Sequence, residues 1–254
     1  MSVRFSGRTA LVTGAGSGIG RTTALAFAAE GAHVVVAGRT AAPLDETVAL
    51  IEARGGKALA VPADVSRAAD WRDLVGAAVD RFGSLDVAVN NAAVFHGGTP
   101  LADLPEADWR AQFDINTTGV FLALQAQIRQ MRTQPSGGAI VNIASTIGVH
   151  TRRPGVAAYA ASKAAVTALT RAAALDHIAD GVRINVVSPG AAATTMSLRP
   201  GESEAERVER VRHELPLGRV SRTAEVAAAV LYLASEDAAS VVGTDLVVDG
   251  GGAL

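Results

Sequence analysis

The sequence predicts an α/β fold, with helices on both faces of a doubly wound, Rossmann-like, parallel seven-stranded sheet. Short β-branched apolar runs alternate with longer Ala- and Leu-rich helical patterns along all 254 residues. The runs are continuously apolar rather than alternating with polar residues, as expected for strands covered on both faces. Such strand–helix alternation implies right-handed crossovers between parallel strands. In this fold, ligands bind at the carboxyl ends of the strands, so the residues after each strand are the informative ones.

Seven apolar runs have the length and composition of buried strands. The predicted strands are Thr9–Thr13, His33–Ala37, Ala58–Val61, Val87–Asn90, Ala139–Ile143, Arg183–Val187 and Leu246–Val248. The helical patterns begin near Gly18, Leu44, Ala68, Ala107, Val156, Glu204 and Thr223. Because no repeat and no Pro/Gly/Ser-rich linker divides the chain, we expect residues 1–254 to form a single domain.

Composition narrows the classes of protein to which the chain can belong. With 49% hydrophobic and 19% charged residues, the chain can fill a globular core. Its net charge of -2 gives no electrostatic footprint for nucleic acid or an anionic membrane, so neither is an expected partner. The absence of cysteine excludes disulfides and thiol nucleophiles, and the five histidines lack metal-ligand spacing, so no metal site is expected. The N-terminus has no apolar signal stretch, and we expect a cytoplasmic protein.

A glycine-rich turn follows the first predicted strand and opens a helix. Gly14, Gly18 and Gly20 let the backbone turn sharply and approach a pyrophosphate without an intervening Cβ. The helix N-terminus around Ser17 and Ile19 adds free N–H groups and a positive dipole end. The spacing differs from the standard G-x-G-x-x-G fingerprint. The pattern predicts a dinucleotide site, and a glycine-rich turn without a ligand is the alternative.

The second predicted strand ends in Gly38 and Arg39 rather than in a carboxylate that accepts the ribose hydroxyls of NAD. A guanidinium can pair with a 2′-phosphate through charge-assisted hydrogen bonds. The sequence therefore predicts NADP as the preferred cofactor, with either cofactor acceptable if Arg39 only faces solvent. After the third strand, Asp64 and Val65 are candidates for contacts to the adenine edge, and helix capping by Asp64 is the alternative.

Tyr159 and Lys163 begin a predicted helix and lie four residues apart. Positions i and i+4 share one face of a helix, so the phenol and the ammonium can be neighbours. A free phenol has a pKa of about 10, and a nearby cation favours the phenolate and lowers that value. The pair predicts a proton-transferring tyrosine assisted by a lysine. The alternative is an amphipathic helix without chemistry.

Further polar residues follow the middle strands. Ser145 ends the fifth predicted strand, where its hydroxyl can bond to a substrate oxygen or serve a turn. Asn91 and Ala92 follow the fourth strand and are expected beside the cofactor. Asn116 lies inside a predicted helix, where asparagine is disfavoured, which indicates a buried polar role.

These motifs resemble those of the short-chain dehydrogenase/reductase family, in its single-domain branch of about 250 residues. Residues 13–20 resemble the TGxxxGIG cofactor motif, and residues 90–93 resemble NNAG, with Ala93 replacing the glycine. Residues 189–194 resemble the PGxxxT segment that holds the nicotinamide carboxamide, and residues 248–251 resemble the usual C-terminal strand ending. The similarity covers essentially the whole chain.

The resemblance implies a dinucleotide-binding and catalytic domain that moves a hydride between NAD(P)(H) and a small carbonyl or alcohol substrate. It implies that Tyr159 transfers the proton, that Lys163 lowers its pKa and holds the nicotinamide ribose, that Ser145 steadies the substrate oxygen and that Asn116 fixes a relay water. The residues expected to bind the cofactor are Gly14, Ser17, Gly18, Ile19, Gly20, Arg39, Asp64, Val65, Asn91, Ala92, Tyr159, Lys163, Pro189, Gly190, Ala192 and Thr194.

Three segments are expected to form the walls of the substrate pocket: the residues after Ala93, residues 147–154 and residues 195–215. They offer the side chains of Phe95, His96, His150, Arg152, Arg153, Met196 and Leu198. Arg152 and Arg153 could attract an acidic substrate or could form a solvated loop face. Residues 193–218 are expected to form a mobile substrate lid. The charges of its polar span, residues 200–206, are expected to face solvent rather than to take part in catalysis.

Three other interpretations stay open at this point. One is a dinucleotide-sensing regulator without catalysis, another is an NAD-dependent alcohol dehydrogenase, and a third is a sugar-nucleotide epimerase or dehydratase. The intact Tyr159 and Lys163 disfavour the sensor, and 254 residues leave little room for the second domain of an epimerase. The helices of Asn116 and Tyr159 are apolar around much of their circumference, so a homodimer or homotetramer is expected.

Overall fold

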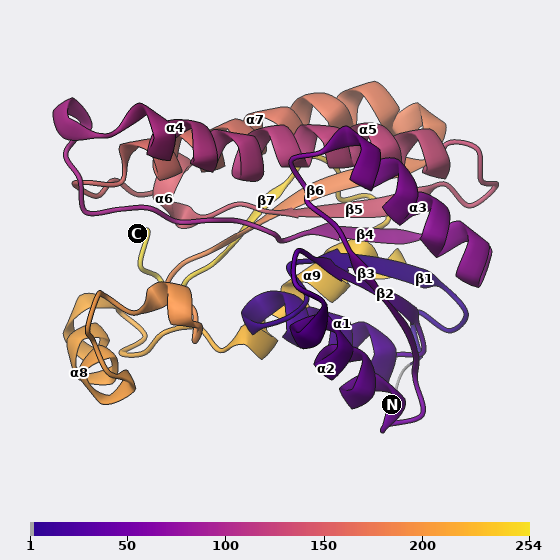
Figure 1. Cartoon of the computed structure of the whole chain (residues 1–254), viewed down its shortest axis with the longest axis horizontal. Helices are drawn as coiled ribbons and strands as arrows, with labels where there is room; N and C mark the ends of the chain where they lie inside the picture. The colour runs from indigo at the N-terminus through magenta and orange to yellow at the C-terminus, as the bar shows by residue number, and fades with distance from the viewer. Residues whose placement is uncertain (1–2) are drawn as a thin grey trace.

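The computed structural model describes residues 3–254 and contains one parallel seven-stranded sheet with strand order β3-β2-β1-β4-β5-β6-β7. Figure 1 shows its strands crossing the middle of the molecule between two layers of helices. The strands are β1 Thr9–Thr13, β2 His33–Gly38, β3 Lys57–Pro62, β4 Val87–Asn90, β5 Gly138–Ile143, β6 Val182–Pro189 and β7 Asp245–Val248. The predicted fold class is confirmed, and each strand lies where the sequence predicts one. The order reverses beside β1, which is the switch point where α/β sheets bind ligands.

Helices α3, α4, α5 and α7 cover one face of the sheet, and α1, α2 and α9 cover the other (Figure 1). The helices are α1 Gly18–Ala29, α2 Ala41–Glu52, α3 Ala68–Phe82, α4 Glu106–Phe113, α5 Gly119–Met131, α6 Thr146–Val149, α7 Ala157–His177, α8 Glu204–Glu214 and α9 Thr223–Ala234. Since both faces are covered, strands β1 to β6 each contribute to two hydrophobic cores, and β7 contributes Leu246 and Val248 to one of them. In β1, Leu11 belongs to the core under α3 and α5, whereas Ala10 and Val12 belong to the core under α1 and α9.

The sequence analysis expects one continuous α-helix from about Ala107, but the structure differs. A π-helical segment, Asp114–Thr118, separates α4 from α5. Asn116 lies in this segment and is fully buried. Its side chain bonds to the loop after β4 and to α7, and these contacts hold the wider turn in place. A π-bulge inside a helix is frequently found at a functional site.

Within residues 3–254, no helix has both the length and the apolar character needed to cross a membrane.

Candidate functional site

The carboxyl ends of β1, β4, β5 and β6 meet at one edge of the sheet. The parallel register pairs Val12 with Val89, Asn90 with Asn142, and Ile143 with Val187. Because neighbouring strands end at nearly the same level, the loops after them share one crevice. Most of the residues that the sequence predicts for the site lie in these loops.

The glycine-rich turn after β1 is packed too closely for side chains. Gly14 has a φ of 64°, and a Cβ there would lie 2.7 Å from the Asn91 Nδ2 atom. A Cβ on Gly20 would overlap the Gly14 carbonyl oxygen and lie 2.6 Å from the same amide nitrogen. Asn91 donates from Nδ2 to the Thr13 carbonyl (2.9 Å), and its backbone N–H donates to the Thr13 hydroxyl (3.0 Å). The Asn91 side chain therefore holds the turn itself and shapes the cradle from behind.

The N-terminus of α1 is free to bind an anion. Ser17 precedes the helix without making a side-chain cap, and the first turn of α1 contains no acidic residue. The N–H groups of the first turn of a helix lack intrahelical partners and carry a partial positive charge. Together with the glycine cradle, this uncapped terminus fits the pyrophosphate of a dinucleotide.

Arg39 follows β2 and is exposed, and Asp64 follows β3 on the neighbouring strand. The Asp64 carboxylate accepts hydrogen bonds from the Ser66 N–H (3.0 Å) and hydroxyl (2.7 Å). These bonds, with a smaller effect from the Arg39 guanidinium, hold the pKa of Asp64 below its usual value. Asp64 thus closes a local turn with Ser66 and does not cap α3, whose N-cap residue is Arg67.

Tyr159 and Lys163 lie on one face of α7, and both are almost completely buried. The Lys163 Nζ atom lies 6.0 Å from the centre of the Tyr159 ring and donates a hydrogen bond to the Ile143 carbonyl at 2.8 Å. Ser145 follows β5 in an extended conformation, and its hydroxyl accepts from the Ile147 N–H at 3.1 Å. The structure therefore brings the three predicted side chains together.

The protonation balance of this cluster differs from the sequence-based expectation that Lys163 lowers the pKa of the phenol. Burial raises the pKa of Tyr159, and a hydrogen bond with Ser145 only partly opposes this. Burial also lowers the pKa of Lys163 to about 8. Desolvation is the main cause of both shifts, because both groups are removed from water.

Asn116 connects the π-helix with two neighbouring segments. Its Oδ1 accepts from the Val94 N–H (2.9 Å), and its Nδ2 donates to the Val94 carbonyl (2.9 Å). Nδ2 also donates to the Ser162 hydroxyl (3.1 Å), which itself donates to the Tyr159 carbonyl (2.8 Å). Asn116 thus fixes the loop after β4 against the Tyr159 turn of α7. Ser162 is missing from the sequence analysis, and its place directly before Lys163 is the signal that could have identified it.

The Asn90 side chain, next to the predicted cofactor residues Asn91 and Ala92, points away from the crevice. Asn90 is buried below the crevice, where its amide bonds to Gln127 (3.0 and 2.8 Å) and Asn142 (2.8 Å). This network joins β4, β5 and α5. The Asn90 side chain therefore stabilises the sheet, whereas Asn91 and Ala92 lie at the crevice.

The segment after β6 closes the crevice from the other side. Gly190 packs directly on Asp249, where a Cβ would lie 2.6 Å from the aspartate Cβ. Ala192 forms a β-bridge with Ser221, and the Thr194 N–H donates to the Ala192 carbonyl at 2.7 Å. A Cβ on Gly18 would lie 3.1 Å from the Thr194 methyl group. The predicted segment from Pro189 to Thr194 therefore faces the glycine-rich turn.

The wall of the expected substrate pocket is mainly aromatic near Tyr159. The Phe95 ring packs edge-to-face on the Tyr159 ring, with 4.9 Å between the ring centres, and remains 38% exposed. A Cβ on Gly97 would lie 2.7 Å from the Phe95 ring, so this glycine gives the ring its space. Gly97 is a second site residue that sequence reasoning missed.

The basic residues expected at the pocket, His150, Arg152 and Arg153, do not converge on a common point as the residues of an anion site would. His150 Nε2 lies 2.9 Å from Asp245 Oδ2 at the start of β7, so the histidine pairs with a buried carboxylate. Arg152 and Arg153 are exposed, and Arg152 donates a hydrogen bond to the Val149 carbonyl at 3.4 Å. These positions favour the solvated loop face over a site for an acidic substrate.

Comparisons with known proteins extend over almost the whole chain. A family model described as enoyl-(acyl carrier protein) reductase matches residues 14–252. The chain is 40% identical over 248 residues to 2,5-dichloro-2,5-cyclohexadiene-1,4-diol dehydrogenase of Sphingobium indicum, covering 97% of each chain. It is 40% identical over 252 residues to cis-4-hydroxycyclohexanecarboxylate dehydrogenase of Sinomonas cyclohexanicum, covering 99% of this chain and 98% of the relative.

Solved structures give the same result. A short-chain type dehydrogenase/reductase from Mycobacterium marinum superposes with a TM-score of 0.92 at 37% identity, covering 98% of this chain and 97% of the other. A xylitol dehydrogenase with bound NAD+ superposes with a TM-score of 0.92 at 33% identity, covering 98% and 100% of the two chains.

Proposed function

The chain belongs to the short-chain dehydrogenase/reductase family, an NAD(P)-dependent family acting on CH–OH groups, and we propose that it interconverts a cyclic secondary alcohol and its ketone with a preference for NADP. The observation that carries this proposal is the convergence of Ser145, Tyr159 and Lys163 at the same edge of the sheet as the uncapped N-terminus of α1. A proton-transferring group and a phosphate cradle at one sheet edge are the two parts that such a reaction requires.

We propose that the cofactor lies along this edge with its pyrophosphate on the turn from Gly14 to Gly20. The adenine end would lie near Arg39, Asp64 and Val65, and the nicotinamide end between Asn91–Ala92 and the segment 189–194. Bound there, the nicotinamide accepts or supplies the hydride. Lys163 would bond to the ribose hydroxyls, since its Nζ reaches the end of β5.

In this proposal, Ser145 and Tyr159 hold the substrate oxygen between them. The Ser145 hydroxyl donates to the oxygen. The Tyr159 phenolate takes the proton of the alcohol in the oxidation, and the Tyr159 phenol returns a proton to the carbonyl oxygen in the reduction. Burial raises the pKa of the Tyr159 phenol and so favours its protonated form. The Lys163 ammonium and the positive charge of an oxidised nicotinamide would shift the phenol toward phenolate, because both charges lie in a site shielded from water. Asn116 holds the Val94 loop in place and would orient a relay water with its remaining Oδ1 lone pair.

The preference for NADP rests on Arg39. No carboxylate follows β2, and the exposed guanidinium can meet a 2′-phosphate in a bidentate contact. The neighbouring Asp64 is already engaged with Ser66, which weakens its competition for Arg39. The NAD+ bound by the related xylitol dehydrogenase makes NAD the alternative.

The substrate class rests on Phe95 and on two relatives. Both named relatives are dehydrogenases of substituted six-membered rings. Here the half-exposed Phe95 ring offers an apolar surface directly beside the phenol of Tyr159. A flat carbocycle could pack on that ring while its hydroxyl reaches Ser145 and Tyr159.

The proposal is tested by following absorbance at 340 nm with NADP+ or NAD+ and a panel of cyclohexanols, linear secondary alcohols and polyols, and in reverse with the ketones. We expect the highest kcat/KM with a cyclohexanol and NADP+. Arg39→Ala should lower the ratio of kcat/KM for NADP+ to that for NAD+ at least tenfold (about 1.4 kcal/mol), with Arg54→Ala, on an exposed turn, as the control. An unchanged ratio contradicts the NADP proposal, and a preference for polyols contradicts the substrate class.

We also propose a homo-oligomer, a dimer or a tetramer. Large apolar side chains are exposed along α4, α5 and α7 and just after α7, namely Trp109, Phe121, Leu175 and Ile178. Burial of these side chains against a second copy would remove them from water. Light scattering measures the mass, and a monomer at micromolar concentration would contradict the proposal.

A further inference from the structure

Residues 195–215 form a unit that leaves the sheet after β6 and returns to it before α9. The unit comprises a 3-10 turn, Thr195–Ser197, and helix α8. Figure 1 shows α8 apart from both helix layers. The base of the unit is closed by the Ala192–Ser221 bridge, where the Ala193 N–H donates to the Ser221 carbonyl at 2.9 Å.

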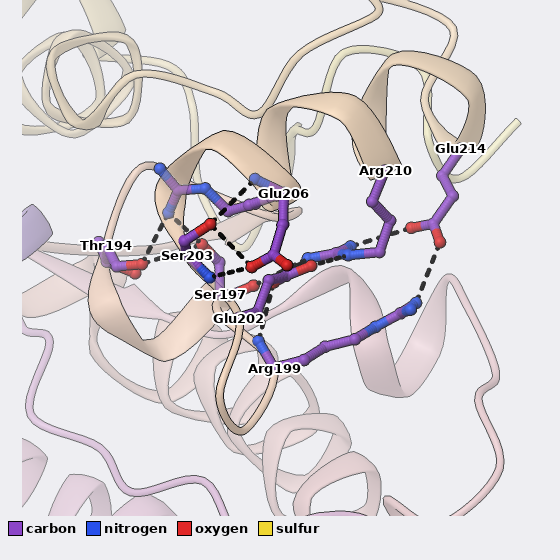
Figure 2. Close-up of polar contacts among 9 residues, drawn as sticks. Thr194, Ser197, Arg199, Glu202, Ser203, Glu206, Arg210 and Glu214 are labelled. Carbon is purple, nitrogen blue, oxygen red and sulfur yellow. Dashed lines mark hydrogen bonds and ion pairs between the residues drawn. The ribbon is translucent and has the colours of Figure 1, made fainter.

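A chain of ion pairs makes this unit internally rigid (Figure 2). Arg210 pairs with Glu202 through two hydrogen bonds of 2.5 and 2.8 Å and with Glu214 at 3.0 Å, and Arg199 reaches Glu214 at 3.0 Å. The Arg210 bonds hold the pKa of Glu202 at about 2. Ser203 adds a capping box at the start of α8. Among residues 200–206, Glu204 is exposed as expected, whereas Glu202 pairs with Arg210 instead of facing solvent.

Arg207 joins the rigid unit to the cofactor side of the molecule. It is only 3% exposed. Its Nη1 donates to the Thr194 carbonyl (3.0 Å) and the Ser197 hydroxyl (2.9 Å), and its Nη2 donates to Glu204 (3.1 Å). Its buried Nε has no hydrogen-bond partner among the described residues.

The contacts of Arg207 compensate only partly for the burial of its charge, so fold stability alone does not explain them. Within residues 3–254, the only carboxylate that pairs with the buried guanidinium belongs to Glu204, which is 79% exposed, so the charge is weakly compensated. A buried donor without a partner calls for a functional explanation. The contact with Thr194 suggests such a function. Arg207 binds the Thr194 carbonyl, and the Thr194 side chain lies against Gly18 at the start of α1. Arg207 therefore spans the distance between α8 and the phosphate cradle.

We propose that Arg207 is a positioning residue that couples closure of residues 195–215 to occupancy of the dinucleotide crevice through the Thr194 carbonyl. This inference rests on the proposed function, since it requires a dinucleotide beside Gly18 and Thr194. Because ion pairs join α8 to Arg199 and Glu202, a shift of Thr194 on cofactor binding would carry the whole unit. Coupling is reciprocal, so the unit should also contribute to cofactor affinity.

Hydrogen exchange measured by mass spectrometry tests the proposal without reference to activity. In the wild type, saturating NADP+ should slow exchange in residues 195–215 at least fivefold. Arg207→Met keeps the length of the side chain but removes its donors, so NADP+ should still bind, with a Kd about tenfold higher, and the protection of residues 195–215 should disappear. Arg207→Lys should restore part of the protection because it keeps a donor for Thr194.

Arg212→Met is the matched control, since Arg212 lies on the same helix, is exposed and pairs only with Glu209. It should leave both the Kd and the protection unchanged. If Arg207→Met does not fold, Ser197→Ala removes one acceptor of the guanidinium and should reduce the protection about twofold.

The outcomes separate the two hypotheses. If the wild type binds neither NADP+ nor NAD+, the proposed function fails. If it binds and residues 195–215 show no protection, or if Arg207→Met retains the full protection ratio, the coupling proposal is overturned. Faster exchange in Arg207→Met with and without NADP+, at an unchanged ratio, would show a purely structural role and would also overturn it.

Discussion

Replacement of Lys163 by methionine should make the protein more stable at neutral pH while it removes activity. Burial lowers the pKa of Lys163 from 10.5 to about 8. At about 1.4 kcal/mol for each pH unit between these values, the charged lysine costs about 3 kcal/mol at pH 7. Methionine fits the same space without a charge but leaves the Ile143 carbonyl without its 2.8 Å hydrogen bond, which costs about 1 kcal/mol. The net expectation is a gain of about 2 kcal/mol.

The sign of the pH dependence follows from the same values. Between pH 8 and 10.5 the unfolded chain binds more protons than the folded one, so wild-type stability rises with pH in this window. Lys163→Met lacks this contribution. Its advantage should therefore shrink by about 2 kcal/mol between about pH 7 and 9.5.

Urea unfolding followed by circular dichroism at the two pH values measures this difference. Lys57→Met is the control, because Lys57 is the only other lysine and is exposed at the start of β3. It should change stability by less than about 0.5 kcal/mol at either pH. If Lys163→Met and the wild type show parallel pH profiles, Lys163 is not a buried cation and the reasoning fails.

Three further substitutions test separate parts of the site. Gly20→Ala should raise the Kd for NADPH at least tenfold in a fluorescence titration, because the new Cβ would meet the Gly14 carbonyl and the Asn91 amide; an unchanged Kd would refute the cradle. Asn116→Ala leaves both backbone groups of Val94 unpaired and should cost about 2–4 kcal/mol in urea unfolding, whereas a loss below 1 kcal/mol would speak against this. Ser145→Ala should lower kcat about 10²-fold at unchanged cofactor Kd, and full activity would remove it from the mechanism.

Much of the fold could be predicted because the strands are short, continuous apolar runs. In β1 and β2 almost every residue is buried, as a sheet between two helix layers requires. The site could be predicted as far as local spacing fixes it. Gly14 to Gly20 lie in one turn, and Tyr159 and Lys163 are one helical turn apart.

Features that depend on distant contacts could not be predicted. The π-helix around Asn116 has the same apolar periodicity as an α-helix over a few residues, and its wider turn depends on bonds to Val94 and Ser162. Arg207 lies in a polar segment whose composition predicts solvent exposure. It is nevertheless buried, with hydrogen bonds to Thr194 and Ser197 that the sequence does not reveal. The pKa of Tyr159 depends on the complete burial of the site, which spacing alone does not show.

The central claim is that the Tyr159 hydroxyl transfers the proton of the substrate. Tyr159→Phe removes only the oxygen and keeps the ring that packs on Phe95. Single-turnover measurements with the best alcohol of the panel and NADP+ should show hydride transfer slower by about 10³-fold or more, with the NADP+ Kd changed less than about threefold. Hydride transfer within tenfold of the wild-type rate, at saturating cofactor, would contradict the account.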